Sequence, residues 1–108
     1  MDVFYALAEP RRRKVVEMLA ESGGLSATRI YEGFDISPQA VSQHLGVLRA
    51  AGVVLMEKRA QQHIYRINPD SMDELAAWTS RMTRLWNERF DRLDQILELE
   101  KKKNAKNR

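Results

Sequence analysis

Residues 37–52, SPQAVSQHLGVLRAAG, carry both a start signal and a stop signal for one helix. The Ser37 hydroxyl oxygen can accept an unpaired N–H of the first turn, and Pro38 suits the first helical position, where no N–H donor is needed. Gly52 supplies the left-handed conformation that commonly follows the last helical residue. The sequence therefore predicts a helix over residues 38–51.

The two faces of this predicted helix differ in chemistry. Val41, Leu45 and Leu48 fall on one apolar stripe at 100° per residue, so that side should be buried. The first two turns otherwise carry short or uncharged side chains, which could read the edges of DNA bases. These residues are Gln39, Ala40, Ser42, Gln43 and His44. A polar helix with no special purpose is the alternative interpretation of this face taken alone.

The segment before this helix favours the DNA-reading interpretation. Residues 26–34, SATRIYEGF, have a candidate N-cap at Ser26 and apolar residues at helical spacing, and Gly33 marks the end. About three residues then separate two short helices. This spacing matches a helix-turn-helix, whose second helix enters the major groove of DNA.

Residues 53–68 predict a β-hairpin, because the β-prone runs VVLMEKR and HIYRI are separated by a short polar turn at residues 60–62. We expect Tyr65 and Ile67 to point inward. The basic and polar tip resembles a wing, which would hold phosphate together with Ser37. The tip residues are Lys58, Arg59, Gln61 and Gln62. A solvated tip whose charges serve only solubility is the alternative.

Two helices are predicted before residue 25, one within residues 2–8 and one from Pro10 to the glycines at 23 and 24. The second begins with RRRK at residues 11–14, and positive charge in a first turn opposes the helix dipole. Either one or two of these arginines pair with Glu9 and Glu17, or the run has a purpose beyond solubility.

A long amphipathic helix is predicted over residues 72–100, with a capping box formed by Ser71 and Glu74. At roughly 43 Å it would outrun a body of about 70 residues, whose radius of gyration is about 11 Å. Its apolar stripe therefore predicts pairing with a second copy, although folding back on the same chain is the alternative. The stripe residues assigned to this interface are Leu75, Trp78, Met82, Leu85, Trp86, Phe90, Leu93 and Leu97.

Composition sets the outer bounds. A chain of 108 residues fits one domain, here over residues 1–100, followed by a basic disordered tail over residues 101–108. The absence of cysteine excludes disulfides, thiolate metal sites and cysteine nucleophiles. There is no apolar run of bilayer length and no secretion signal at the N-terminus, so we expect a cytoplasmic protein with no membrane partner. No phosphate loop or catalytic constellation points to an enzyme.

Three stretches, FYALAEPRRRKVVEML, ISPQAVSQHLGVLRAAGVV and HIYRINP, resemble in their order the ArsR/SmtB family of winged-helix transcriptional regulators over residues 2–97. The resemblance implies a mainly α fold with a small β-hairpin: a winged helix-turn-helix with a long C-terminal dimerisation helix. It also implies a homodimeric repressor that binds an operator palindrome in double-stranded DNA. The interface would include the first helix, and we assign Phe4 to it.

The chain departs from the metal-sensing members of that family. The segment RIYEGFDIS lacks their paired cysteines, and residues 70–108 contain no histidine, so we expect neither a metal nor another cofactor. Two alternatives stay open: a winged helix that binds only protein, and a regulator that an organic ligand releases from DNA. A protein-binding module would favour exposed Leu or Phe at positions 39, 43 and 46, which are Gln, Gln and Gly.

Overall fold

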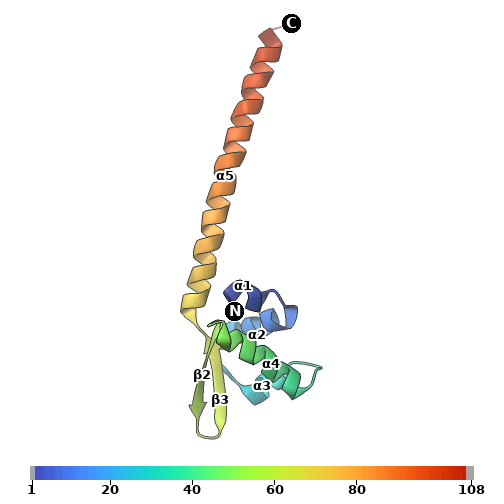
Figure 1. The fold of residues 1–108 in the computed structure, drawn as a ribbon, viewed down its shortest axis with the longest axis vertical. Helices are drawn as coiled ribbons and strands as arrows, with labels where there is room; N and C mark the ends of the chain where they lie inside the picture. Colours follow the sequence, from blue (N-terminus) through green and yellow to red (C-terminus); the bar gives the residue numbers. More distant parts are fainter. Residues whose placement is uncertain (1, 107–108) are drawn as a thin grey trace. The chain divides into compact units, whose positions relative to one another are not determined.

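The computed structural model describes residues 2–106 (Figure 1). Its elements in chain order are α1 Val3–Leu7, α2 Pro10–Ser22, β1 Leu25–Ser26, α3 Ala27–Glu32, α4 Pro38–Ala50, β2 Val54–Arg59, β3 Gln62–Ile67 and α5 Pro69–Lys106. The mainly α fold with a hairpin and a long C-terminal helix is thereby confirmed. The chain divides into two compact units, Met1–Asp73 and Glu74–Arg108, whereas we expected one domain over residues 1–100. The boundary falls inside α5, so the described part of the second unit, up to Lys106, is a single helix.

The helix starts predicted for α2 and α4 are confirmed by their caps. The Glu9 carboxylate accepts a hydrogen bond from the backbone N–H of Arg12 at 3.0 Å, ahead of Pro10. The Ser37 hydroxyl oxygen accepts one from the N–H of Ala40 at 3.2 Å. Gly52 has the left-handed φ of 76° that the sequence predicts just after α4.

The core of the first unit lies between the helices and the sheet. Val41, Leu45 and Leu48 of α4 are all buried, as their spacing predicts. Burying each of these side chains stabilises the fold by about 1.5–3 kcal/mol relative to leaving it exposed. The buried apolar residues are Val3, Ala6, Val15, Leu19, Ile30, Val41, Leu45, Leu48, Val53, Val54 and Tyr65. α4 is therefore anchored along one stripe.

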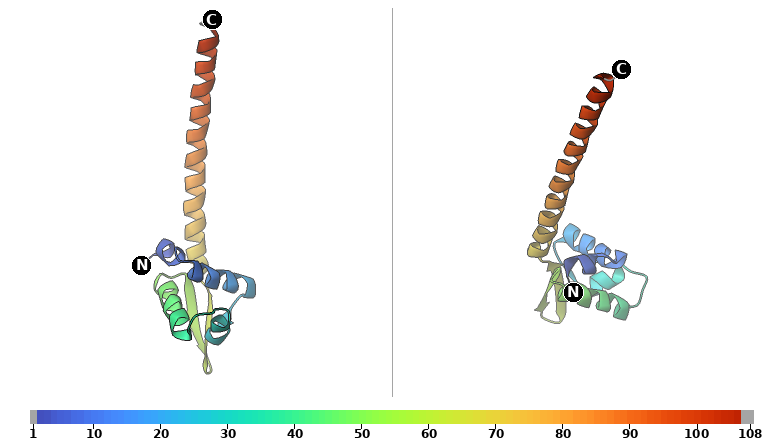
Figure 2. Two further views of the ribbon diagram at one scale, coloured as in Figure 1. Left: turned by 90° about the vertical axis from the view of Figure 1, so that its right-hand side faces the viewer. Right: turned by 45° about the horizontal axis from the view of Figure 1, so that its top comes forward.

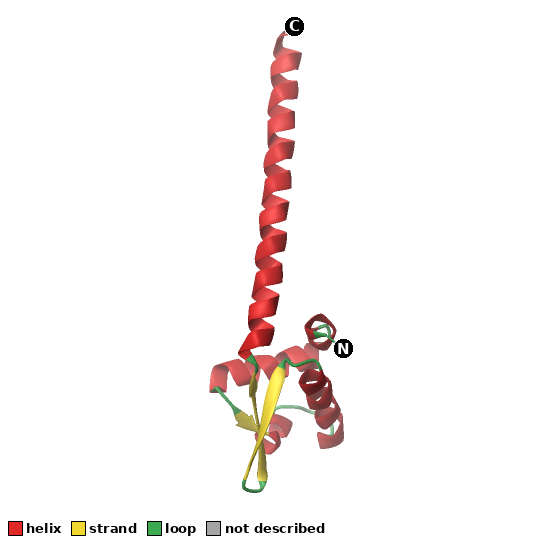
Figure 3. Cartoon of the chain, turned by 60° about the vertical axis from the view of Figure 1, so that its left-hand side comes forward, coloured by secondary structure: helices red, strands yellow, loops and turns green. Residues whose placement is uncertain are grey.

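The sheet has three antiparallel strands in the order β1, β3, β2 (Figure 3). The sequence did not predict β1, because two residues are too few to show strand alternation. Pairing of Arg59 with Gln62 leaves a two-residue turn, one residue shorter than expected. The first turn residue, Ala60, takes a left-handed φ of 54°, which is uncommon for a residue other than glycine.

The register of the hairpin settles which side chains face the core. Val54 pairs with Ile67 and Met56 with Tyr65, and paired residues share a face. Tyr65 is buried and Ile67 half-buried, so the predicted inward orientation is confirmed. Burial raises the pKa of the Tyr65 phenol, the nearby Tyr31 raises it further, and Arg49 opposes this in part.

The predicted capping box at the start of α5 is wrong. The helix begins earlier, at Pro69, and the Asn68 side-chain oxygen caps it by accepting from the N–H of Asp70 at 3.2 Å. Ser71 is buried within the first turn, where its hydroxyl donates to the carbonyl oxygen of Asn68 at 2.7 Å. A side chain inside the first turn cannot serve as the cap that precedes it.

The far end of α5 also differs from the prediction. The helix continues to Lys106, so residues 101–106 are helical where we expected a disordered tail; residues 107–108 lie outside the described part. Lys101 lies 4.0 Å from Glu98 one turn earlier, and positive charge suits the C-terminal end of a helix dipole. Among residues 2–106 no helix is long and apolar enough to cross a membrane.

We predict that Asn68→Ala lowers the free energy of unfolding by about 1–3 kcal/mol. The Asn68 amide donates to the carbonyl oxygen of Gly52 at 2.9 Å while its oxygen caps α5, so one side chain joins the end of α4 to the start of α5. Thermal unfolding followed by circular dichroism measures the change. Asn68→Ser keeps a capping oxygen, so its free energy of unfolding should lie between those of the wild type and Asn68→Ala. Asn87→Ala, an exposed control, should change the free energy of unfolding little. An unchanged Asn68→Ala variant would contradict this role.

Candidate nucleic-acid interface

The outward face of α4 offers hydrogen-bonding groups that the chain leaves unused. Gln39, Ser42 and Gln43 are exposed, as predicted, and within residues 2–106 their side chains have no hydrogen-bond partner. Ala40 is half-buried beside them. A hollow of about 340 Å³, lined by Tyr31, Pro38, Gln39 and Ser42, opens next to the first turn of α4. These groups are therefore accessible to a partner molecule.

Gly46 lies two turns further along the exposed side of α4. A Cβ built at this position would have no neighbouring heavy atom within 4 Å, and the backbone is not left-handed. Glycine inside a helix costs about 0.5–1 kcal/mol relative to alanine. Neither the packing nor the backbone of this chain explains that cost, so the position is open to close approach from outside.

The predicted wing residues all lie at the tip of the hairpin, but they do not all lie on the same face of it. Lys58 pairs with His63 on the face that also carries Tyr65, whereas Arg59 pairs with Gln62 on the other face. Gln61 lies in the turn between them. Figure 2 shows α4 and the hairpin side by side from two directions. A groove of double-stranded DNA and the sugar-phosphate backbone beside it could therefore contact α4 and the hairpin together.

Arg59 has a partner, Glu57, that the sequence did not predict. Its guanidinium lies 3.4 Å from the carboxylate of Glu57, and the two side chains are 75% and 49% exposed. Exposed ion pairs are worth at most about 1 kcal/mol, so a phosphate group could replace the carboxylate.

A second polar hollow could not be predicted from the sequence, because it depends on the pairing of β1 with β3. It measures about 170 Å³ and lies between the start of α3 and the wing. Thr28 and His63 line it together with the predicted wing residues Gln61 and Gln62. The pairing of β1 with β3 places the start of α3 beside the returning strand of the wing.

His44 is not placed with the reading residues. Its side chain is only 19% exposed, and Nδ1 lies 3.4 Å from Nη1 of Arg12 and 3.8 Å from a carboxylate oxygen of Glu9. The contacts of this side chain are therefore with α2 and its cap. Packing is the role that the structure supports for His44.

The basic side chains in the first turn of α2 donate hydrogen bonds to main-chain carbonyl groups. Arg12 donates to the carbonyl oxygens of Ala6 at 2.6 Å and Tyr5 at 3.2 Å, both in α1. Lys14 donates to the carbonyl oxygen of Gly33 at 2.7 Å, at the end of α3. The carbonyls of a last helical turn lack partners within the helix. These side chains therefore complete the ends of two short helices.

Of the two alternatives for this basic run, the pairing of its arginines with Glu9 and Glu17 is not what the structure shows. Among residues 2–106, no carboxylate lies within ion-pair distance of the four basic side chains at residues 11–14. Glu9 instead caps α2. Burial acts to raise the pKa of the Glu9 carboxyl, but the hydrogen bond from the backbone N–H of Arg12 and the electrostatic influence of the nearby His44 side chain outweigh it, so the pKa lies below its ordinary value. Glu9 is therefore ionised at neutral pH.

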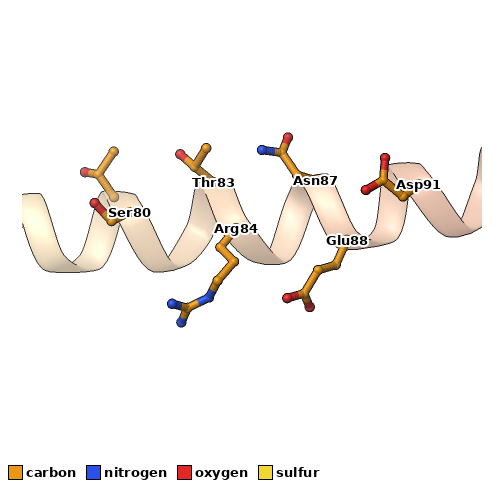
Figure 4. Close-up of a pocket in the computed structure, with 7 residues that line it drawn as sticks. Ser80, Thr83, Arg84, Asn87, Glu88 and Asp91 are labelled. Carbon is orange, nitrogen blue, oxygen red and sulfur yellow. The ribbon is translucent and has the colours of Figure 1, made fainter.

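α5 has one polar face and one apolar face. A hollow of about 460 Å³ is lined by α5 residues alone, so nothing encloses a ligand there (Figure 4). Its lining residues are Thr79, Ser80, Thr83, Arg84, Asn87, Glu88 and Asp91. The apolar face exposes Leu85, Trp86, Phe90, Leu93 and Leu97. Leu75 and Met82 are half-buried, and Trp78 and Phe4 are 42% and 40% exposed.

Within residues 2–106, no group of three or more His, Asp or Glu side chains is arranged to hold a metal ion. The features that stand out are instead an exposed polar helix after a tight turn and a basic hairpin beside it. These features define a winged helix-turn-helix protein of the DNA-binding class.

Comparison with known proteins agrees with this assignment to the winged helix-turn-helix class and identifies the family. A helix-turn-helix domain model matches residues 7–57. The transcriptional repressor SdpR of Bacillus subtilis is 32% identical over 77 residues, covering 71% of this chain and 84% of SdpR. The regulator Rv2034 of Mycobacterium tuberculosis is 33% identical over 95 residues, covering 88% of this chain and 85% of Rv2034.

Among solved structures, an ArsR-like transcriptional regulator from Rhodococcus sp. RHA1 superposes with a TM-score of 0.77 at 28% identity, covering 89% of this chain and 87% of that one. The chain belongs to the ArsR/SmtB family of winged-helix transcriptional regulators. It is a DNA-binding regulator and not an enzyme.

Proposed function

We propose that this protein is a dimeric repressor that recognises a palindromic operator through α4. The observation that carries the proposal is the row of exposed, unpartnered groups of Gln39, Ser42 and Gln43 on a helix anchored by its opposite stripe. A glutamine amide can bond both edge atoms of adenine, and serine can bond several bases. Ala40 would contact a thymine methyl group.

Phosphate contacts would fix the position of α4 on the duplex. Ser37 uses its oxygen to cap α4 but keeps a hydroxyl hydrogen to donate. The wing would contribute the remaining groups, with the Arg59 guanidinium exchanging Glu57 for phosphate. The proposed phosphate-contacting residues are Ser37, Lys58, Arg59, Gln61 and Gln62. We do not retain His44 in this set, because its contacts lie within the chain.

The second copy would pair through the apolar face of α5. Leu75, Trp86 and Leu97 recur at intervals of 11 residues, a spacing that keeps one stripe on one side of a nearly straight helix. Exposed apolar side chains in such a continuous stripe mark an interaction surface, and a two-fold dimer is the commonest solution. Two recognition helices about 34 Å apart would then meet successive turns of the major groove.

The sequence further supports a regulator that does not respond to metals, because it has no cysteine and no histidine after His63. We also propose that the protein acts in the cytoplasm, where a DNA-binding regulator of this family would meet its operator. A purely protein-binding winged helix is less well supported, because positions 39 and 43 carry glutamines and position 46 carries no side chain.

Base readout by Gln43 predicts a loss confined to certain sequences. Replacing Gln43 by Ala should cost about 1–3 kcal/mol at one or two operator positions and little on scrambled DNA. Arg59→Ala should weaken all sequences alike and lower the salt slope by about one. Titrations against an operator selected from genomic fragments, at 50–200 mM salt, compare the two variants. Equal losses on every sequence for Gln43→Ala would remove it from the readout.

Close approach at Gly46 predicts opposite effects on stability and binding. Gly46→Ala should stabilise α4 by about 0.5–1 kcal/mol and raise Tm by roughly 2–8 °C, because alanine is the better helix former. The added methyl group should weaken operator binding by about tenfold, which is 1.4 kcal/mol. Calorimetry and titration measure the two effects. A stabilised variant with unchanged affinity would contradict the close approach.

Pairing through α5 predicts that the site of an added charge matters. Trp86→Glu should dissociate the dimer at micromolar concentration, because a carboxylate would be buried in the apolar stripe. Asn87→Glu adds the same charge on the polar face shown in Figure 4 and should leave the dimer intact. Sedimentation of both variants gives the association state. A wild-type protein that is monomeric under these conditions would contradict the proposal.

A further inference from the structure

Arg12 is a point at which three helices meet. It belongs to α2, and its Nε and Nη2 atoms donate to the carbonyl oxygens of Ala6 and Tyr5 in α1. Its Nη1 atom lies 3.4 Å from Nδ1 of His44 in α4. The guanidinium also lies over the Tyr5 ring, 5.4 Å from the centroid. One side chain therefore contacts both the first helix and the reading helix.

The geometry of this contact constrains how α1 and α4 are placed. A guanidinium is planar and its five N–H donors point in fixed directions, unlike the freely rotating donors of lysine. Bonds from Nε and Nη2 to two carbonyls of α1 orient the group, and the fixed direction of the Nη1 donors then determines where an acceptor on α4 can lie. Nδ1 accepts this bond when the imidazole proton is on Nε2.

We infer that Arg12 and His44 are a positioning pair that sets the orientation of α4 relative to α1. The inference rests on the proposed function, in which α4 reads the bases, and on the expected place of Phe4 of α1 in the dimer interface. The angle between these two helices then decides the separation of the two reading helices in the dimer. The pair thereby tunes which spacing of operator half-sites is accepted, without touching DNA.

Arg13 provides a control, because it shares the charge of Arg12 and its bonds to carbonyls at the end of α1, whereas within residues 2–106 it contacts neither α4 nor the Tyr5 ring. It lies one residue later in the same first turn and carries the same charge. Its Nη1 atom also donates to two carbonyls at the end of α1, those of Leu7 at 2.8 Å and Ala8 at 3.2 Å. Loss of charge and loss of capping are therefore common to Arg12→Ala and Arg13→Ala.

The test compares these two variants on a selected operator, on operators whose half-sites are moved by one base pair in either direction, and on scrambled DNA. Both variants should lose the same small factor on scrambled DNA. Arg12→Ala should lose about ten times more than Arg13→Ala on the operator and should discriminate less between spacings. Equal behaviour of the two variants overturns the inference. A wild-type protein with no operator preference would instead overturn the proposed function.

A second pair of variants tests the partner on α4. His44→Asn keeps an acceptor near the position of Nδ1, whereas His44→Leu keeps a similar volume without one. The Asn variant should retain the spacing preference, and the Leu variant should lose it as Arg12→Ala does. Circular dichroism confirms that each variant is folded. If His44→Leu keeps the wild-type preference, the pair does not position α4, even where Arg12→Ala proves too unstable to measure.

Discussion

The burial of one stripe of α4 is the constraint on which the rest of this structure depends. Val41, Leu45 and Leu48 must leave water together, and at 100° per residue this turns Gln39 and Gln43 outward. The apolar side of the helix supplies the stabilisation, so the polar side is free of packing demands. A recognition surface can then carry groups without partners in the chain, which a buried face could not tolerate.

The short helices need hydrogen-bond donors for their carbonyl groups, and the basic side chains in the first turn of α2 supply them. α1 has five residues and α3 has six, so most of their carbonyl groups have no partner within the helix. The side chains of Arg12, Arg13 and Lys14 donate hydrogen bonds to carbonyl oxygens at these helix ends. Their positive charges are unfavourable at the N-terminus of α2, because this is the positive end of the helix dipole. Glu9 offsets part of that cost with its ionised carboxylate at the N-cap. The charged side chains of this turn therefore stabilise the fold, and the proposed phosphate contacts lie on the wing instead.

The proposed function is divided between the two compact units. The first unit holds the reading helix and the wing, and the second is a helix whose apolar face is exposed along several turns. An exposed stripe that carries Trp86 and Phe90 is costly for a lone chain and favourable for a dimer. Since a palindromic operator presents two equivalent half-sites, the proposed pairing and the proposed DNA recognition require the same two-fold symmetry.

Signals within about four residues determined much of this protein from sequence alone: the caps at Ser37 and Gly52, the stripe of α4, the hairpin and the long amphipathic helix. Tertiary structure alone decided the pairing of Leu25 with Tyr65, the bond from Asn68 to Gly52 and the contact between Arg12 and His44. The last two join residues 16 and 32 positions apart. No local pattern encodes such a contact, because its partners meet only after the core has brought their helices and strands together.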